Sequence, residues 1–178
     1  MDRYDGFREF VLARQQALTR SAYLLTGDAH LAEDLMQSVL LKVAKHWPRL
    51  VLRGTPEAYT RKAMINQYIS WQRRKRLESP SADPPEHGHA HDDATVDRLI
   101  LRQALARLTP RQRAVIVLRF YEDLSERETA EILGCSLGTV KSQTHHALGR
   151  LRALAPELSQ WFTEIEEVPS EQAARGAG

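Results

Sequence analysis

One stretch near the middle of the chain, SPSADPPEHGHAHDDAT over residues 79–95, limits the possible folds more than any other feature. It contains three prolines, one glycine and almost no large apolar side chain, so it cannot contribute to a hydrophobic core. We therefore predict a flexible acidic linker that divides the chain into two lobes. The 178 residues suffice for two small domains, which commonly have about 50–80 residues each.

On both sides of this linker, apolar residues recur at helical spacing and no stretch alternates as a strand does. In the first lobe the pattern predicts helices over residues 4–25, 29–47 and 56–77, with Asp28 as an N-cap and Pro48 ending the second helix. The first domain is therefore predicted at residues 1–78.

The second lobe carries clearer helix-start signals. After a helix over residues 96–108, capping boxes at Thr109–Gln112 and at Ser125–Glu128 each predict the start of another helix. A last helix extends towards Leu154, and Pro156 ends it. The predicted fold is all-α, with a second small helical domain at residues 96–156 and an acidic, disordered tail at residues 157–178.

Charge is distributed unevenly along the chain, although the net charge is only +2. Residues 1–78 carry 14 basic and 8 acidic side chains, and residues 98–155 carry 10 and 5. The linker and the tail are acidic, with five acidic side chains each in residues 79–97 and 156–178. Two basic lobes favour a polyanion as the partner.

The segment LSERETAEILGCSLGTVKSQTHHALGRLR contains a short helix, a tight turn at Gly134 and a second helix. Ala130 is small where the helices would cross, and Leu133, Cys135 and Val140 would fill the angle between them. This pattern indicates a helix-turn-helix, whose second helix lies in the DNA major groove, rather than a hairpin of an ordinary bundle. The candidate contacts to bases or phosphates are Arg127, Leu137, Thr139, Lys141, Ser142, His145, Arg150 and Arg152.

Two motifs resemble a known family. LTPRQR at residues 108–113, followed by the helix-turn-helix segment, resembles the fourth domain of extracytoplasmic-function sigma factors of the sigma-70 family. In the first lobe, ALTRSAYLLTGDAHLAEDLMQSVLLKVAKHW resembles the second sigma domain, with its AEDL-x-Q motif. The resemblance covers about residues 1–160. The GTVKSQT segment and the residues from Trp71 to Arg74 are similar to the SigE-like actinobacterial subgroup.

This resemblance implies a factor that binds core RNA polymerase and directs it to promoter DNA. The AEDL-x-Q helix of the family docks on the clamp helices of the largest polymerase subunit, which assigns polymerase binding to Glu33, Asp34 and Gln37. Where family members often have an acid after this Gln, the chain has Ser38. The resemblance leaves open whether an anti-sigma factor binds the chain.

The third helix of the first lobe matches the family segment that melts and holds the promoter −10 element. The matching candidates are Arg61, Lys62, Asn66, Arg73 and Arg74, and the loop at residues 49–55 is where a pocket for a flipped base would be built. The acid that usually follows this Asn by four residues is Ser70 here. Trp71 is open to two roles, in the core or stacked on a base. By the same resemblance, the second lobe would read the −35 element in duplex form.

Other classes of protein fit less well. The sequence has no Gly-rich phosphate loop and no nucleophile–base set, which argues against an enzyme. We expect no cofactor or metal, since the single Cys135 cannot build a zinc site, and His87, His89 and His91 alternate in a segment that we expect to be solvated and unstructured. No apolar run approaches the roughly 18 residues of a membrane span, so we expect a cytoplasmic protein without membrane insertion.

Two alternative functions use the same residues. A plain helix-turn-helix regulator would bind a palindromic site without polymerase, with the first lobe serving for dimerisation or sensing. An adaptor would bind polymerase without loading it on DNA. Reversing the charge of Asp34 separates these functions, because only a sigma factor would lose promoter-specific transcription.

Overall fold

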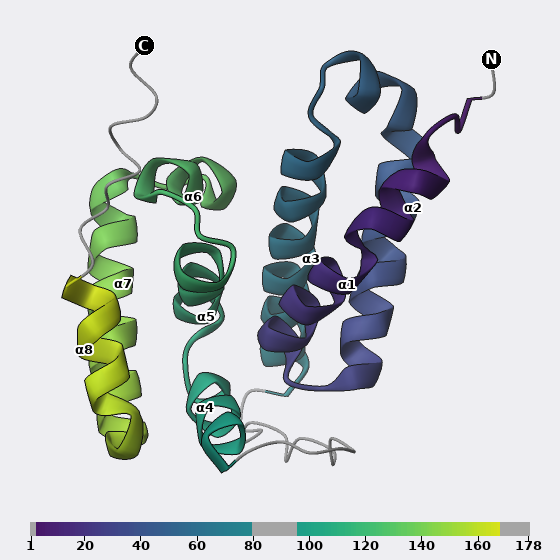
Figure 1. Cartoon of the computed structure of the whole chain (residues 1–178). Coiled ribbons are helices and arrows are strands. Elements are labelled where there is room, and N and C mark those ends of the chain that lie inside the picture. The colour runs from purple at the N-terminus through teal and green to yellow at the C-terminus, as the bar shows by residue number, and fades with distance from the viewer. Residues whose placement is uncertain (1–2, 80–95, 168–178) are drawn as a thin grey trace. The chain divides into compact units, whose positions relative to one another are not determined.

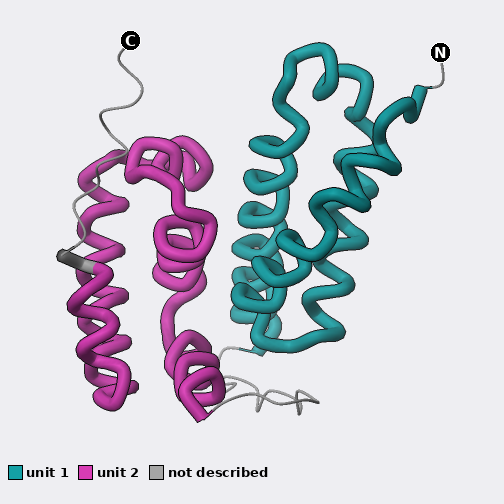
Figure 2. The backbone as a smooth tube through the Cα atoms, in the orientation of Figure 1, with its two compact units in different colours: residues 1–88 teal, residues 89–178 magenta. Residues whose placement is uncertain are grey.

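The computed structural model describes residues 3–79 and 96–167, which form helices and turns and contain no strand (Figure 1). The backbone divides into two compact units, Met1–Gly88 and His89–Gly178 (Figure 2). This confirms the predicted all-α fold with two helical domains. The predicted linker, with its three histidines, lies almost entirely outside the described residues. No helix in the described ranges has both the length and the apolar character needed to cross a membrane.

Unit 1 is a three-helix bundle of α1 (Phe7–Thr26), α2 (Ala29–Leu52) and α3 (Pro56–Glu78). Helix α2 packs against both of the others, and its apolar stripe includes Leu35, Val39 and Val43, which are fully buried. The predicted N-cap is confirmed, since the Asp28 side chain accepts a hydrogen bond of 2.9 Å from the backbone N–H of Leu31. These contacts orient α2 and α3 so that each has one face in the core and one in solvent.

The prediction that Pro48 ends the second helix is wrong, because α2 continues to Leu52. A proline inside a helix lacks one backbone donor, but the added turn buries Leu50, which is 7% exposed. The helix ends instead at a Schellman motif, in which Gly54 has φ of 64° and the N–H of Thr55 donates to the carbonyl of Leu50 at 3.0 Å. The predicted loop at residues 49–55 is therefore only the short turn at residues 53–55.

Unit 2 is built around one long central helix. Its elements are α4 (Val96–Ala106), α5 (Pro110–Ile116), the π-helical turn η1 (Val117–Tyr121), α6 (Glu126–Leu133), α7 (Leu137–Leu154), the 3-10 turn η2 (Pro156–Leu158) and α8 (Ser159–Glu167). Helix α7 packs against α4, α5, α6 and α8. Three residues on its inner side, Val140, Leu148 and Leu151, are at most 1% exposed. One side of α7 thus provides much of the core of this unit.

Both predicted capping boxes are confirmed. The Thr109 hydroxyl accepts from the N–H of Gln112, and the Gln112 side chain accepts from the N–H of Thr109, each at 3.2 Å. The same reciprocal pair joins Ser125 and Glu128, at 3.2 and 2.8 Å. These caps determine where α5 and α6 begin, and therefore where the helix-turn-helix lies in unit 2.

The prediction of a disordered tail from residue 157 is wrong for its first part, because residues 159–167 form α8. Phe162, in the middle of this helix, is only 1% exposed, and α8 packs along α7. The burial of one large aromatic side chain stabilises a segment whose overall composition is acidic and polar. The rest of the predicted tail, residues 168–178, lies outside the described residues.

Candidate polymerase and nucleic-acid interfaces

The three residues predicted to bind polymerase lie on the solvent side of α2. Glu33, Asp34 and Gln37 are all exposed, while Leu35 and Val39 of the same helix are fully buried. Asp34 and Gln37 are three residues apart and therefore neighbours on the helix surface. The core leaves this polar group available to a partner.

Helix α3 carries a basic and polar face in solvent. Lys62, Asn66 and Arg73 are exposed and follow one another by four and seven residues, so they lie along one line of the helix. Met64 and Tyr68, on the opposite side, are at most 3% exposed. Arg74 is also exposed, at the flank of this line. The structure thus brings four of the five predicted −10 contacts to the solvent side of one helix, and Trp71 is half-buried beside the core.

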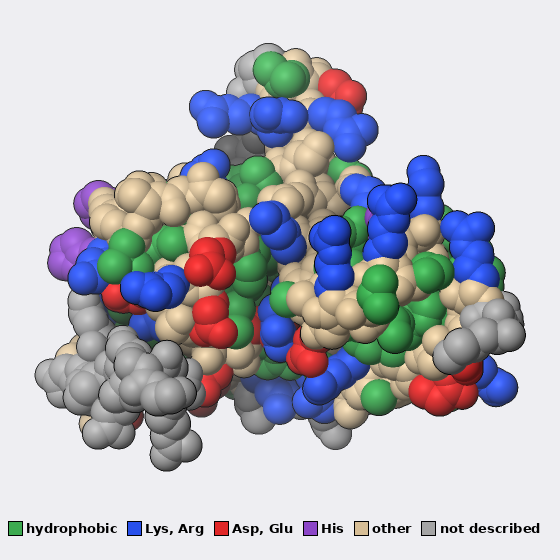
Figure 3. Space-filling view, turned by 90° about the horizontal axis from the view of Figure 1, so that it is seen from above, with side chains coloured by type: hydrophobic (Ala, Val, Ile, Leu, Met, Phe, Trp, Pro, Cys, Tyr) green, Lys and Arg blue, Asp and Glu red, His purple; other side chains and the backbone are tan. Residues whose placement is uncertain are grey.

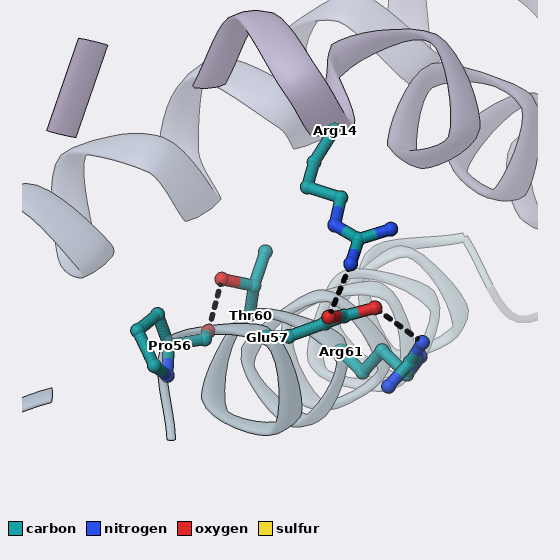
Figure 4. A network of polar contacts seen from close by, with 5 residues as sticks. All are labelled: Arg14, Pro56, Glu57, Thr60 and Arg61. Carbon is teal, nitrogen blue, oxygen red and sulfur yellow. Dashed lines mark hydrogen bonds and ion pairs between the residues drawn. The ribbon is translucent and has the colours of Figure 1, made fainter. Parts of the chain in front are cut away.

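Arg61 lies apart from this line and belongs to a charged network (Figure 4). Its guanidinium contacts the Glu57 carboxylate at 2.9 Å, and the other oxygen of that carboxylate contacts Arg14 of α1 at 2.8 Å. The side chains of Arg14, Glu57 and Arg61 are 49, 39 and 23% exposed. One carboxylate therefore holds two guanidinium groups, which come from different helices, at the start of α3.

A hollow of about 450 Å³ opens beside this network. It is lined by Phe10, Arg14, residues 54–58 and Arg61, so it includes part of the turn between α2 and α3. The predicted pocket segment, residues 49–55, contributes only Gly54 and Thr55, because the residues before them are helical or at the helix end. Helix α1, which the sequence did not suggest, supplies the remaining wall.

The helix-turn-helix of unit 2 has the predicted geometry. Gly134 adopts φ of 62°, and the N–H of Cys135 donates to the Ala130 carbonyl at 3.1 Å, which closes α6. Ser136 then caps α7 by accepting from the N–H of Thr139 at 3.1 Å. Leu133 is 9% exposed and Ala130 is 8% exposed, so both pack between the helices as predicted, whereas Cys135 is half-buried.

The predicted DNA contacts on α7 fall into two groups. Leu137, Lys141, Ser142 and His145 are exposed in the first turns of the helix, with Leu137 at 45%. Thr139 is half-buried, and its hydroxyl lies 2.8 Å from that of Ser136, so it serves the cap. Arg127, the predicted contact on α6, is exposed. The Lys141 ammonium lies 3.9 Å from the carboxylate of Glu126, also on α6.

Arg150 has a structural role in addition to the predicted phosphate contact. Its guanidinium donates to the backbone carbonyl of Arg107 at 2.7 Å and to the side chain of Gln112 at 3.3 Å. These bonds tie α7 to the connection between α4 and α5. They orient the recognition helix relative to the rest of unit 2.

Sequence reasoning missed His146. It is exposed, follows Ser142 by four residues, and its ring centroid lies 5.9 Å from that of His145. Figure 3 shows histidine side chains (purple) at the left edge of unit 2, with Lys and Arg side chains (blue) standing out nearby. Counting four residues on from Ser142 would have placed His146 on the same helix face.

The described residues contain no group of three His, Cys, Asp or Glu side chains placed to hold a metal ion. The three linker histidines considered as zinc ligands lie outside these residues. The candidate surfaces on α2, α3 and α7 are exposed and carry polar or charged side chains, as expected for binding to macromolecules.

Comparison with known proteins identifies the family. The family model of sigma-70 region 2 matches residues 10–78, and that of sigma-70 region 4 matches residues 98–151. The RNA polymerase sigma-E factor of Streptomyces coelicolor is 44% identical over 167 residues, which cover 90% of this chain and 93% of that protein. The ECF RNA polymerase sigma factor SigL of Mycobacterium tuberculosis is 34% identical over 148 residues, covering 79% and 84%. This chain belongs to the extracytoplasmic-function sigma factors.

A solved structure agrees with this assignment. The sigma factor RpoE of Bartonella quintana, crystallised with the anti-sigma factor NepR, has a TM-score of 0.70 to this sigma factor and 27% identity, and the match covers 84% of this chain and 96% of that one. This sigma factor thus binds core RNA polymerase and directs transcription initiation at promoters. The predicted family is confirmed, and the comparisons favour it over a regulator that acts without polymerase. Helix α8 lies beyond the residues that the region 4 model matches.

Proposed function

We propose that unit 1 opens and holds the −10 element while unit 2 reads the −35 element as duplex DNA. The observation that carries this proposal is the separation of faces on α3 and α7. On each helix the core side is apolar, and most of the polar and basic residues that match the sigma motifs are exposed on the other side. Each unit therefore has one surface available to nucleic acid.

On α3, the line of Lys62, Asn66 and Arg73 is about 16 Å long, since a helix rises about 1.5 Å per residue. That length suits a single strand whose phosphates contact the basic residues while Asn66 hydrogen-bonds a base. The hollow beside the Arg14–Glu57–Arg61 network supports the binding of a flipped base close to the same strand. Arg74, at the flank of the line, adds a further phosphate contact.

In unit 2, the exposed first turns of α7 support contacts to base edges in the major groove. Ser142, His145 and the additional His146 offer hydrogen-bonding groups, and Lys141 of α7 and Arg127 of α6 would contact phosphates. Leu137 would give apolar contact to a thymine methyl group. Arg150 would act mainly by holding α7 in place.

Core polymerase would dock on Glu33, Asp34 and Gln37 of α2. Their exposure supports this assignment, as does their place in the region 2 match. Because RpoE is held by the anti-sigma factor NepR, we propose that an anti-sigma factor also regulates this sigma factor. We further propose that it acts in the cytoplasm, where the polymerase works, and that it has no enzymatic activity of its own.

The test is run-off transcription with purified core polymerase on fragmented DNA from the source organism. Discrete transcripts that need this protein would define its promoter through alignment of the start sites. On such a promoter, Asn66→Ala should reduce strand opening, measured by permanganate reactivity of −10 thymines, and should leave binding of the −35 duplex unchanged. Ser142→Ala with His145→Ala should instead weaken −35 binding. Gln16→Ala, an exposed polar change on α1, is the control.

The assignment fails if the two sets of variants give the same defect. It also fails if the Asn66 variant opens promoters at the normal rate. A stable complex with core polymerase that yields no transcript would favour the adaptor function instead.

A further inference from the structure

Leu41 is a large apolar residue that the fold of unit 1 leaves in solvent. Its exposed fraction is 73%, although Val39 and Val43, two residues before and after it, are fully buried. It follows Asp34 by seven residues and Gln37 by four, so it lies on the same outer line of α2, one turn beyond Gln37.

The polar group on α2 is a poor source of binding free energy by itself. Exposed charges such as Glu33 and Asp34 contribute little binding free energy when they form ion pairs, because water and salt already screen them in the free protein. Stable interfaces have an apolar, buried centre surrounded by a polar rim. A few well-packed side chains near that centre usually give most of the affinity. On the outer line of α2, Leu41 is adjacent to the polar group and can supply such a centre.

We propose that Leu41 is the apolar anchor of the surface through which this sigma factor binds core RNA polymerase. The proposal rests on the proposed docking role of Asp34 and Gln37. The partner surface would hold an apolar pocket about two helical turns away from basic side chains, which would face Glu33 and Asp34. Leu52 is also exposed on this line, but it lies about 16 Å beyond Leu41, far from the polar group.

Polymerase fits this surface better than DNA does. The two acidic side chains about two turns away would repel phosphates, and an exposed leucine has no strong partner in a phosphate backbone. A second copy of this chain is the other candidate occupant, because Asp34 at one end of the line and Lys45 at the other could pair in an antiparallel dimer. The two occupants predict different measurements.

The test compares two leucines of nearly equal exposure on different helices. Leu41 on α2 is 73% exposed and Leu77 near the end of α3 is 74% exposed. Binding of labelled full-length protein to core polymerase is measured without DNA, for Leu41→Ala, Leu77→Ala and Leu41→Met. We expect Leu41→Ala to weaken binding about tenfold or more, the usual effect at an interface centre. The other two variants should bind within about twofold of the unchanged protein, because one lies off the surface and the other keeps the apolar volume.

Asp34→Lys, measured beside these, separates failure of the anchor from failure of the docking surface. If Asp34→Lys weakens binding and Leu41→Ala does not, the anchor role is wrong and the docking surface stands. If neither change affects binding, both proposals are wrong. Equal losses for Leu41→Ala and Leu77→Ala would also overturn the anchor role, as would a self-associated species in sedimentation that Leu41→Ala dissociates.

Discussion

The network of Arg14, Glu57 and Arg61 allows a direct test of how unit 1 holds single-stranded DNA. The Glu57 carboxylate lies 2.8 Å from one guanidinium and 2.9 Å from the other. A DNA phosphate that enters the adjoining hollow must therefore compete with Glu57 for both arginines. We expect Glu57→Gln to strengthen binding of a −10 single strand, because it removes the competitor and keeps the shape of the side chain.

The magnitude follows from the geometry. Each ion pair is partly exposed and is worth roughly 0.2–1 kcal/mol, so the release of two pairs should raise affinity by about two- to thirtyfold. Each guanidinium that gains a phosphate should also steepen the dependence of log K on log salt by about 0.7 for a single strand. The expected change in slope is thus about 0.7 to 1.4. The free energy of unfolding of unit 1 should fall by about 0.5–2 kcal/mol through loss of the same pairs.

The assay is fluorescence anisotropy of a labelled −10 oligonucleotide over a series of salt concentrations. Glu9→Gln, at an exposed carboxylate in the first turn of α1, gives the same change in net charge away from the network and is the control. Weaker binding by Glu57→Gln, with an unchanged slope, would refute the reasoning. It would mean that Glu57 orients Arg61 for DNA instead of competing for it.

Three further changes test the fold that carries these surfaces. Phe162→Ala should destabilise unit 2 by about 3 kcal/mol in denaturant unfolding, since its ring is 1% exposed, and an unchanged midpoint would show that α8 is not anchored there. Gly134→Ala should cost about 1–2 kcal/mol because φ is 62°, with weaker −35 binding in gel shifts; normal stability and binding would argue against a left-handed turn. Pro48→Ala should restore a backbone donor inside α2 and raise the free energy of unfolding by about 1–2 kcal/mol, which would appear as a higher melting temperature. A lower melting temperature would show that the proline is favourable where it lies.

Helix starts and the helix-turn-helix were predictable because each depends on a local signal. Thr109, Ser125 and Asp28 carry side-chain acceptors at fixed offsets from the backbone N–H groups that they satisfy. Gly134 is placed where the chain needs a left-handed residue. None of these signals requires knowledge of a distant part of the chain.

The errors occurred where tertiary burial outweighed a local signal. Pro48 normally ends a helix, yet burial of Leu50 extends α2 by a further turn. The acidic composition after residue 156 predicted disorder, yet burial of Phe162 supports α8. Gly54, which has the left-handed conformation typical of a C′ residue, was a signal that could have corrected the first error.

The candidate sites were predictable as sets of exposed residues on one helix, and less so where two elements meet. The α3 line follows from spacing alone, whereas the pairing of Arg61 with Glu57 and Arg14 depends on how α1 crosses α3. Likewise, the bonds of Arg150 to Arg107 and Gln112 join positions about 40 residues apart in the chain. A single sequence does not contain these distances.

The division of α7 into two sides has an evolutionary consequence. Val140, Leu148 and Arg150 meet the structural requirements of the helix, while Ser142, His145 and His146 are exposed and carry none of its core. Exposed substitutions of this kind usually change stability by less than about 0.5 kcal/mol. After gene duplication, substitutions at these few exposed positions could therefore change the preferred promoter sequence, with little effect on the stability of the folded protein.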